Sequence, residues 1–300
     1  MGNHLCSSST IFVDGEESFR ETVERVAGTD LTRLDALSGT SLTTFFSDES
    51  NHIWKCRFEQ DICEYRRYVR NLNEILKLPE SDYVLKPKHV RRVGKHIILT
   101  CTDYGKEDLY MRCQRPFDVW EMLDNLAHLA SGIHWLHSQG LAHRDVKPEN
   151  VVFHNEKYKW IDFEFTSVLD EWMICGSPHY LAPYKVIQKW SVDWNMRSRR
   201  MDVFAFGKMI FFVLWAAASH YCIDHGQYLY KMFLADFAVS MEQPFEGVLK
   251  DWVQCALKCC QSVPPLSIPL PTTVSKTVRA YDQVTIRTGS QMVFADDQFA

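Results

Sequence analysis

Residues 143–150 read His-Arg-Asp-Val-Lys-Pro-Glu-Asn, and this octet says more about the fold than any other part of the chain. Upstream, apolar residues recur at helical spacing across residues 119–136, and Gly140 follows the last turn as a C-cap. Downstream, residues 151–153 and 158–161 read as two short strands joined by a turn. The octet is therefore predicted to form a polar loop between a buried helix and a β-hairpin.

This octet resembles the catalytic loop of the eukaryotic-type protein kinases. The resemblance implies that Asp145 accepts the proton of the attacking hydroxyl, Lys147 steadies the transferring phosphoryl group and Asn150 holds a metal ion on the ATP phosphates. It also implies that Asp162, which follows the hairpin, is the main Mg²⁺ ligand, because hard cations prefer carboxylate oxygen. A lysine at position 147 resembles the serine/threonine branch of the family.

Two later motifs agree with this resemblance. Residues 175–184 (Cys-Gly-Ser-Pro-His-Tyr-Leu-Ala-Pro-Tyr) resemble the end of a kinase activation segment. Residues 201–207 resemble the start of the central C-lobe helix, whose aspartate, here Asp202, braces the catalytic loop. The implied fold is α+β, the two-lobed protein-kinase fold with a small β-rich N-lobe and a large α-helical C-lobe. The predicted divisions are an N-terminal extension (1–30), the N-lobe (31–103), the C-lobe (104–276) and a C-terminal tail (277–300).

The motifs of the predicted N-lobe are weaker. Residues 37–42 are the best candidate for the phosphate-binding loop, and Gly39 alone remains of the usual three glycines. Residues 52–58 alternate like a strand and place Lys55 where the family has its phosphate-contacting lysine. The alternative for Lys55 is a solvated lysine on an edge strand.

The acidic partner of Lys55 is left open between two residues. Residues 59–78 are predicted to form a helix. Its apolar stripe would consist of Ile62, Tyr65, Val69, Leu72 and Leu76. Glu64, on the early turns, is the first choice to pair with Lys55, and Glu74 is the second. Either glutamate can instead belong to a solvated face.

The nucleotide site is completed by the predicted hinge. Residues 96–101 read as the strand that enters the hinge, and residues 102–105 form the hinge itself. The resemblance implies that Asp108 holds the ribose hydroxyls, and that the cofactors are ATP and Mg²⁺.

Some positions depart from the family pattern. Glu164 replaces the glycine that normally follows Asp162-Phe163. Tyr184 replaces a glutamate whose arginine partner is also replaced, by Leu270. Both partners of a buried ion pair are lost together, so no charge is left unpaired, which indicates a structural substitution rather than decay.

The activation segment departs from the pattern as well. Met173 stands where the family often has a regulatory phosphoacceptor. Arg144, which would normally bind that phosphate, is predicted to pair with Asp170 or Glu171 instead. The alternative is that both acidic side chains are solvated.

Composition agrees with an ordinary globular protein, with 46% hydrophobic and 24% charged residues. The net charge of −5 gives no sign of a nucleic-acid surface, so no nucleic-acid partner is predicted. Ten scattered cysteines indicate reduced thiols in the cytoplasm or nucleus. The apolar stretch 210–218 is too short to span a bilayer and is predicted to be a buried helix.

The N-terminus offers a signal for lipid attachment. Gly2 fits the start of an N-myristoylation signal, and Cys6 is placed to accept a palmitoyl chain. Together they would anchor the protein to the cytoplasmic face of a membrane. The alternative is an N-terminus without lipid.

The sequence thus predicts transfer of the γ-phosphoryl group of ATP to serine or threonine hydroxyls of protein substrates. One alternative is a pseudokinase scaffold or decoy, which the poor glycine loop and Glu164 favour. Another is a small-molecule kinase of related fold, against which residues 147–150 and 176–183 argue. The oligomeric state is not predicted.

Overall fold

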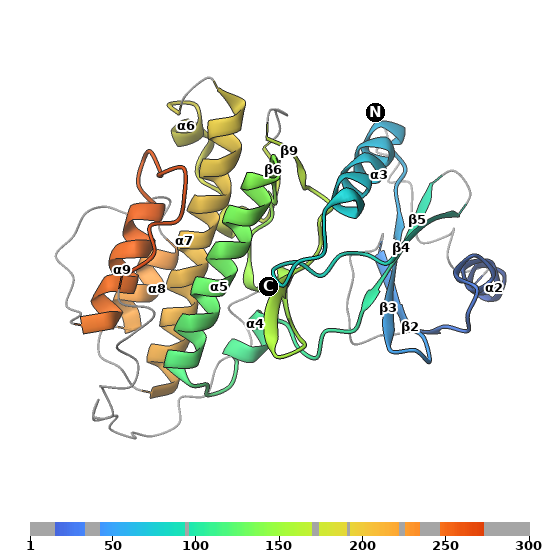
Figure 1. The fold of residues 1–300 in the computed structure, drawn as a ribbon, viewed down its shortest axis with the longest axis horizontal. Coiled ribbons are helices and arrows are strands. Elements are labelled where there is room, and N and C mark those ends of the chain that lie inside the picture. Colours follow the sequence, from blue (N-terminus) through green and yellow to red (C-terminus); the bar gives the residue numbers. More distant parts are fainter. Residues whose placement is uncertain are drawn as a thin grey trace, which may run out of the picture. The chain divides into compact units, whose positions relative to one another are not determined.

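The chain folds into two compact units. The computed structural model describes residues 16–33, 43–93, 96–169, 174–190, 193–221, 226–234 and 247–272. The N-terminal unit comprises residues 1–77 and 85–104, and the C-terminal unit comprises residues 78–84 and 105–300. The secondary structure differs between them, since the first is built on a sheet and the second mainly on helices (Figure 1).

The N-terminal unit is built on a five-stranded antiparallel sheet with the strand order β1-β2-β3-β5-β4. Its elements are α2 (Glu16–Ala27), β1 (Thr32–Arg33), β2 (Thr43–Ser47), β3 (His52–Phe58), α3 (Ile62–Lys77), β4 (His89–Val93) and β5 (Ile97–Asp103). The strand predicted over residues 52–58 is confirmed as β3. The strand predicted over 96–101 is β5, which continues two residues further, into the predicted hinge.

Helices α2 and α3 cover opposite faces of this sheet (Figure 1). One face packs Trp54 and Cys56 of β3 against Val23 of α2. The other face packs Ile98 of β5 against the buried residues of α3. Because side chains alternate along a strand, Lys55 lies on the same face as Ile98, which is the face that α3 covers.

Helix α3 starts later than the sequence predicts. Asp61 caps its first turn, because its carboxylate accepts hydrogen bonds from the backbone N–H of Cys63 (2.7 Å) and of Glu64 (3.0 Å). The predicted apolar stripe is correct only in its middle, since Ile62 and Leu76 are 45% and 36% exposed. The buried residues are Tyr65, Tyr68, Val69, Asn71, Leu72 and Ile75. Both exposed residues lie in terminal turns, so the sheet covers only the central turns of the helix.

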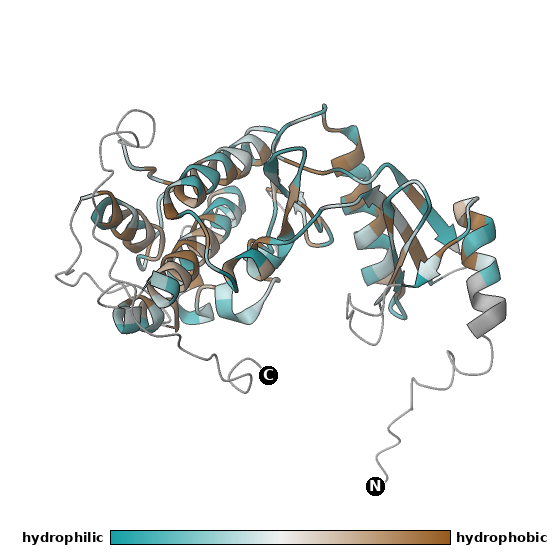
Figure 2. Ribbon diagram, turned by 90° about the horizontal axis from the view of Figure 1, so that it is seen from below, coloured by the Kyte–Doolittle hydropathy of each residue, from teal (hydrophilic) through white to brown (hydrophobic). Residues whose placement is uncertain are grey.

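The C-terminal unit contains the remaining elements. Its helices are α4 (Leu109–Cys113), α5 (Val119–Ser138), α6 (Tyr184–Ile187), α7 (Trp194–Tyr221), α8 (Gly226–Leu234) and α9 (Gly247–Cys259), with the 3₁₀ helices η1 (Pro148–Asn150) and η2 (Pro178–Tyr180). Its strands are β6 (Leu141–Ala142), β7 (Val151–His154), β8 (Lys157–Trp160) and β9 (Ser167–Val168). Figure 2 shows that single helices carry both apolar and polar stretches, as expected where one face packs inward.

The elements predicted on either side of the octet are confirmed. Helix α5 spans Val119–Ser138, and Gly140 follows it with a φ of 78°, the left-handed conformation that ends helices. The predicted hairpin is β7 and β8. Its turn residues Asn155 and Glu156 have φ of 49° and 63°, as a two-residue hairpin turn requires.

Helix α7 is the central helix of the C-terminal unit. It contains the buried apolar stretch predicted for residues 210–218, but it begins at Trp194 and is 28 residues long. Among the described residues, it is the one helix long and apolar enough to cross a membrane by length and composition alone. In the structure 94% of its most apolar window is buried, which fits a core helix.

Candidate active site

Asp202 of α7 holds the octet loop in place. Its carboxylate is fully buried and accepts hydrogen bonds from the backbone N–H of His143 (2.9 Å) and of Arg144 (2.7 Å). It accepts a third from Nε2 of His137 in α5 (2.8 Å). Burial alone would raise the pKa of Asp202, but these hydrogen bonds and the nearby histidines lower the pKa below its usual value. The predicted brace of the loop is therefore present, as an ionised carboxylate.

His143 is held as a neutral ring. Its Nε2 lies 3.1 Å from the backbone oxygen of Ile161, to which it donates, and its Nδ1 accepts from the backbone N–H of Asp145 at 3.3 Å. Complete burial lowers the pKa of His143, although Asp202, Asp145 and Asp162 act in the opposite direction. A proton on Nδ1 would remove the acceptor of the Asp145 backbone N–H, so this hydrogen bond requires the neutral ring.

Asp145 lies at the centre of a set of polar contacts. Its Oδ1 accepts from the backbone N–H (2.8 Å) and the hydroxyl (2.9 Å) of Ser177. Its Oδ2 accepts from the side-chain amide of Asn150 at 2.8 Å and lies 3.1 Å from Nζ of Lys147. The carboxylate is 6% exposed, and its orientation is fixed by groups from two segments of the chain.

Ser177 is a site residue to which the sequence assigned no role. Lys147 donates from Nζ to the Ser177 hydroxyl at 2.7 Å, so Ser177 connects Lys147 with Asp145. The only indication of this role in the sequence was the position of Ser177 in the predicted activation segment. The contact depends on Gly176, which has a φ of 112° and where a Cβ would lie 2.4 Å from the backbone oxygen of Arg144.

Asn150 and Asp162 stand at the same end of the β7–β8 hairpin. The backbone N–H of Ile161 donates to the backbone oxygen of Asn150 at 2.9 Å, which extends the ladder to the residue before Asp162. The Asn150 amide nitrogen donates to both the backbone oxygen and the carboxylate of Asp145, each at 2.8 Å, which leaves its carbonyl oxygen as a ligand atom. An amide oxygen beside a carboxylate is the donor chemistry that Mg²⁺ prefers.

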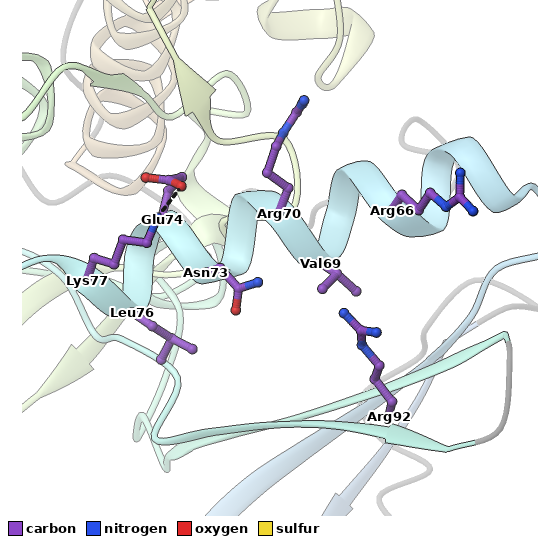
Figure 3. A pocket seen from close by; sticks show the side chains of 8 residues that line it. All are labelled: Arg66, Val69, Arg70, Asn73, Glu74, Leu76, Lys77 and Arg92. Carbon is purple, nitrogen blue, oxygen red and sulfur yellow. Dashed lines mark hydrogen bonds and ion pairs between the residues drawn. The ribbon is translucent and has the colours of Figure 1, made fainter.

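The predicted pairing of Lys55 with a glutamate of α3 remains a prediction. Glu64 forms an ion pair with Arg67, and Glu74 forms one with Lys77 at 2.6 Å, each with a partner on its own helix. Figure 3 shows Glu74 and Lys77 among the side chains that line a pocket between α3 and Arg92 of β4. Ion pairs of this kind on a helix surface contribute little to stability, so they do not prevent a change of partner.

Asp108 caps the short helix α4. Its Oδ1 accepts from the backbone N–H of Met111 at 2.7 Å, and burial raises the pKa of this carboxylate. The structure thus gives Asp108 a structural contact, and its predicted role toward ribose stays a prediction. Gly39 of the predicted phosphate loop lies outside the described residues, as do Gly2 and Cys6.

Arg144 has described partners other than acidic residues. Its Nη2 donates to the hydroxyl of Ser198 at 3.0 Å and lies 3.4 Å from the backbone oxygen of Val168. The acidic partners predicted for it, Asp170 and Glu171, lie outside the described residues, as does Met173.

Glu164 and Tyr184, two of the departures from the family pattern, differ in how far they are exposed. Glu164 is 8% exposed, next to Phe163, whose ring packs on His143 at 5.3 Å between centroids. Tyr184, which replaces the glutamate of the usual ion pair, is 57% exposed. A side chain in contact with solvent needs no partner to compensate for burial, so the change at Tyr184 is tolerated without one.

Comparison with known proteins agrees with this geometry. Residues 53–263 match the family model of the protein kinase domain, and the chain therefore belongs to the protein kinase family. This confirms the predicted α+β kinase fold, with its β-sheet N-terminal region and its helical C-terminal region. Members of this family are phosphotransferases and generally use ATP and Mg²⁺.

Three relatives show how low the sequence identity to known kinases is. The Homo sapiens cAMP-dependent protein kinase catalytic subunit PRKX is 30% identical over 166 residues, which cover 49% of this chain and 45% of the relative. The Homo sapiens putative serine/threonine-protein kinase PRKY is 35% identical over 154 residues (49% and 53%). The Mus musculus dual specificity protein kinase TTK is 22% identical over 249 residues (78% and 28%). The chain thus spans about half, or less, of the length of these relatives.

Proposed function

We propose that the protein transfers the γ-phosphoryl group of ATP to serine or threonine hydroxyls of protein substrates. The observation that carries this proposal is the contact of Asp145 with both Lys147 and Ser177. It places a carboxylate that can accept the hydroxyl proton beside an ammonium group that can stabilise charge on the phosphoryl oxygens.

In the proposed reaction Asp145 orients the substrate hydroxyl and accepts its proton as the new O–P bond forms and the bond to ADP breaks. Lys147 acts through hydrogen bonds rather than through proton transfer. Its ammonium group has three N–H donors, and the contacts with Ser177 and Asp145 use two of them. The third is available to the transferring phosphoryl oxygens, whose charge it would stabilise.

Asn150 and Asp162 would hold Mg²⁺ through the Asn150 carbonyl oxygen and the Asp162 carboxylate. The metal ion, when bound, neutralises charge on the ATP phosphates. Lys55 would contact the phosphates as well, with Glu64 or Glu74 as its partner, while Gly39 would lie over them and Asp108 would hold the ribose.

The preference for serine and threonine is supported by Lys147, which resembles the serine/threonine branch. The name of the PRKY relative points the same way, whereas the TTK relative is named as a dual specificity kinase. Tyrosine peptides therefore belong in the test.

The experiment is transfer of labelled phosphate from Mg·ATP to serine, threonine and tyrosine peptide libraries by the full chain. We expect Asp145→Asn to lower transfer at least about 100-fold, because the proton acceptor is lost, while ATP binding is retained. Asp82→Asn is the matched control, since Asp82 is exposed and its carboxylate pairs with Lys157, which is itself on the surface. Equal transfer by wild type and Asp145→Asn would contradict the proposal.

The pseudokinase alternative is supported by Glu164, a buried acid two residues after the proposed metal ligand Asp162. A thermal-shift titration with Mg·ATP separates the two functions. Stabilisation by Mg·ATP without transfer to any peptide would favour a scaffold that binds nucleotide.

A further inference from the structure

Three side chains with different donor atoms meet at the turn between β2 and β3. They are Asp48, His52 and Cys101, and one oxygen, one nitrogen and one sulfur atom of them lie within 4.8 Å of one another. We propose that these three residues form a structural site for Zn²⁺ in the N-terminal unit. The site is independent of the catalytic loop, and it does not rest on the proposed kinase activity.

The chain fixes the first two ligands through the backbone of a tight turn. The backbone N–H of Asp48, just after β2, donates to the backbone oxygen of His52, the first residue of β3, at 3.2 Å. Asn51 closes the turn with a φ of 62° and donates to the backbone oxygen of Asp48 at 3.2 Å. Cys101 is supplied by β5, where it lies opposite Trp54 of β3. Three strands therefore hold the donor atoms in place.

The surrounding groups orient these ligands. The indole N–H of Trp54 donates to Oδ2 of Asp48 at 2.8 Å, and the His52 backbone N–H donates to Oδ1 at 3.0 Å. Nδ1 of His52 lies 3.0 Å from Oδ2 of Asp48. Asp103 lies 3.6 Å from Nε2 of the same ring. Nζ of Lys88 lies 3.2 Å from the same Nε2. With a metal ion on Nδ1, the ring proton would sit on Nε2, so the Lys88 ammonium group would have to turn away from the ring. Asp103 would then accept this proton, the carboxylate–histidine arrangement common in zinc sites.

The charges around the cluster suit a divalent cation. Asp48 and Asp103 each carry a negative charge, and Lys88 contributes a positive charge 2.5 Å from Asp103. On metal binding, the Cys101 thiol releases its proton to solvent and adds one further negative charge. The bound site would then be electrically neutral, which matters because Cys101 is only 1% exposed.

The donor set selects the metal. Sulfur, imidazole nitrogen and carboxylate oxygen together favour Zn²⁺, whereas Mg²⁺ and Ca²⁺ prefer oxygen alone. Ligand atoms around tetrahedral zinc lie about 3.3 to 3.8 Å apart. Nδ1 of His52 and Oδ2 of Asp48 are already closer than this, at 3.0 Å, so only the longer separations in the cluster, which reach at most 4.8 Å, would have to shorten. His89 of β4, directly opposite Cys101, or a water molecule would complete the four ligands.

The test uses Co²⁺ as a spectroscopic substitute for Zn²⁺. The full chain is freed of metal with a chelator and titrated with Co²⁺, and thiolate-to-cobalt absorption is recorded. We expect one equivalent of Co²⁺ to give this band in wild type, and Zn²⁺ to displace it. Cys101→Ser should lose the band.

Cys56→Ser is the matched control, because Cys56 is also buried, on the same face of the same sheet, without an Asp–His pair. It should keep the band. His52→Gln is a second variant, at a side chain only partly buried, in case Cys101→Ser does not fold. It should weaken Co²⁺ binding at least about 10-fold. A band that survives in Cys101→Ser, or that Cys56→Ser removes, would overturn the proposal.

Discussion

Asp202 connects three parts of the C-terminal unit through one carboxylate. Removing it would leave the backbone N–H groups of His143 and Arg144 and the ring of His137 without their acceptor, inside the core. We expect Asp202→Ala to lower the free energy of unfolding by about 3 to 5 kcal/mol, because buried groups that lose their partner pay the full cost of desolvation.

Chemical denaturation of Asp202→Ala and wild type measures this difference. Asp124→Ala is a suitable control, since Asp124 lies on an exposed position of α5 and its loss should change stability by less than about 0.5 kcal/mol. A loss below about 1 kcal/mol for Asp202→Ala would show that the loop holds without the brace.

His143 gives the protein a dependence on pH. Burial lowers its pKa in the folded chain, so the unfolded chain binds a proton more readily. The stability from the neutral ring is therefore fully present above the unfolded pKa of about 6.5 and is lost as the pH falls toward the folded pKa. Asp202, whose pKa is also lowered, adds a loss only at more acidic pH, below its unfolded value of about 3.9.

We expect the free energy of unfolding to fall between pH 7 and pH 5, and His143→Phe to reduce this slope. Denaturant titrations at several pH values measure it. Burial also lowers the pKa of His128. The variant should therefore keep a smaller dependence of the unfolding free energy on pH. An unchanged slope in His143→Phe would assign the effect to other groups.

At the scale of elements, the activation segment meets the catalytic loop at Gly176. A methyl group there would lie 2.4 Å from the backbone oxygen of Arg144, and the φ of 112° is also unfavourable for alanine. We expect Gly176→Ala to push Ser177 away from Asp145 and Lys147, and to lower phosphoryl transfer by about tenfold or more.

Gly140→Ala separates the effect of the steric contact with Arg144 from the effect of the positive φ. Gly140 also has a positive φ, of 78°, but nothing lies within 4 Å of the position of its Cβ. It should cost about 1 kcal/mol in stability and leave the transfer rate nearly unchanged. Equal loss of activity in both variants would indicate that backbone strain, rather than the contact with Arg144, is responsible.

The elements next to the octet were predictable because their signals are local. Helix α5 follows a continuous apolar period, and the β7–β8 hairpin follows short apolar runs around a polar turn. The first and last residues of α3 were not predictable, because the sheet covers only the central turns of this helix. The contacts of Ser177 and His137 depend on segments far apart in the chain, which no local pattern records.

At the scale of the whole molecule, each unit has its own apolar core, and the predicted functional residues divide between the units. Asp145, Lys147, Asn150 and Asp162 all belong to the C-terminal unit, where motif spacing and hydrogen bonds agree. Lys55 and both candidate glutamates belong to the N-terminal unit. The motifs there are weak, since a lysine on a strand or a glutamate on a helix has many ordinary explanations.

Membrane attachment is the remaining proposal that concerns the whole molecule. We propose that Gly2 carries a myristoyl chain and that Cys6 adds a palmitoyl chain, because a single myristoyl group binds membranes only marginally. Protein made in eukaryotic cells should therefore show both acyl masses and sediment with membranes. Gly2→Ala should lose the myristoyl mass and move to the soluble fraction, while Cys6→Ser should keep that mass and bind membranes weakly. An unmodified N-terminus in such cells would contradict this proposal. The predicted cellular location would then be the cytoplasm or nucleus without a membrane anchor.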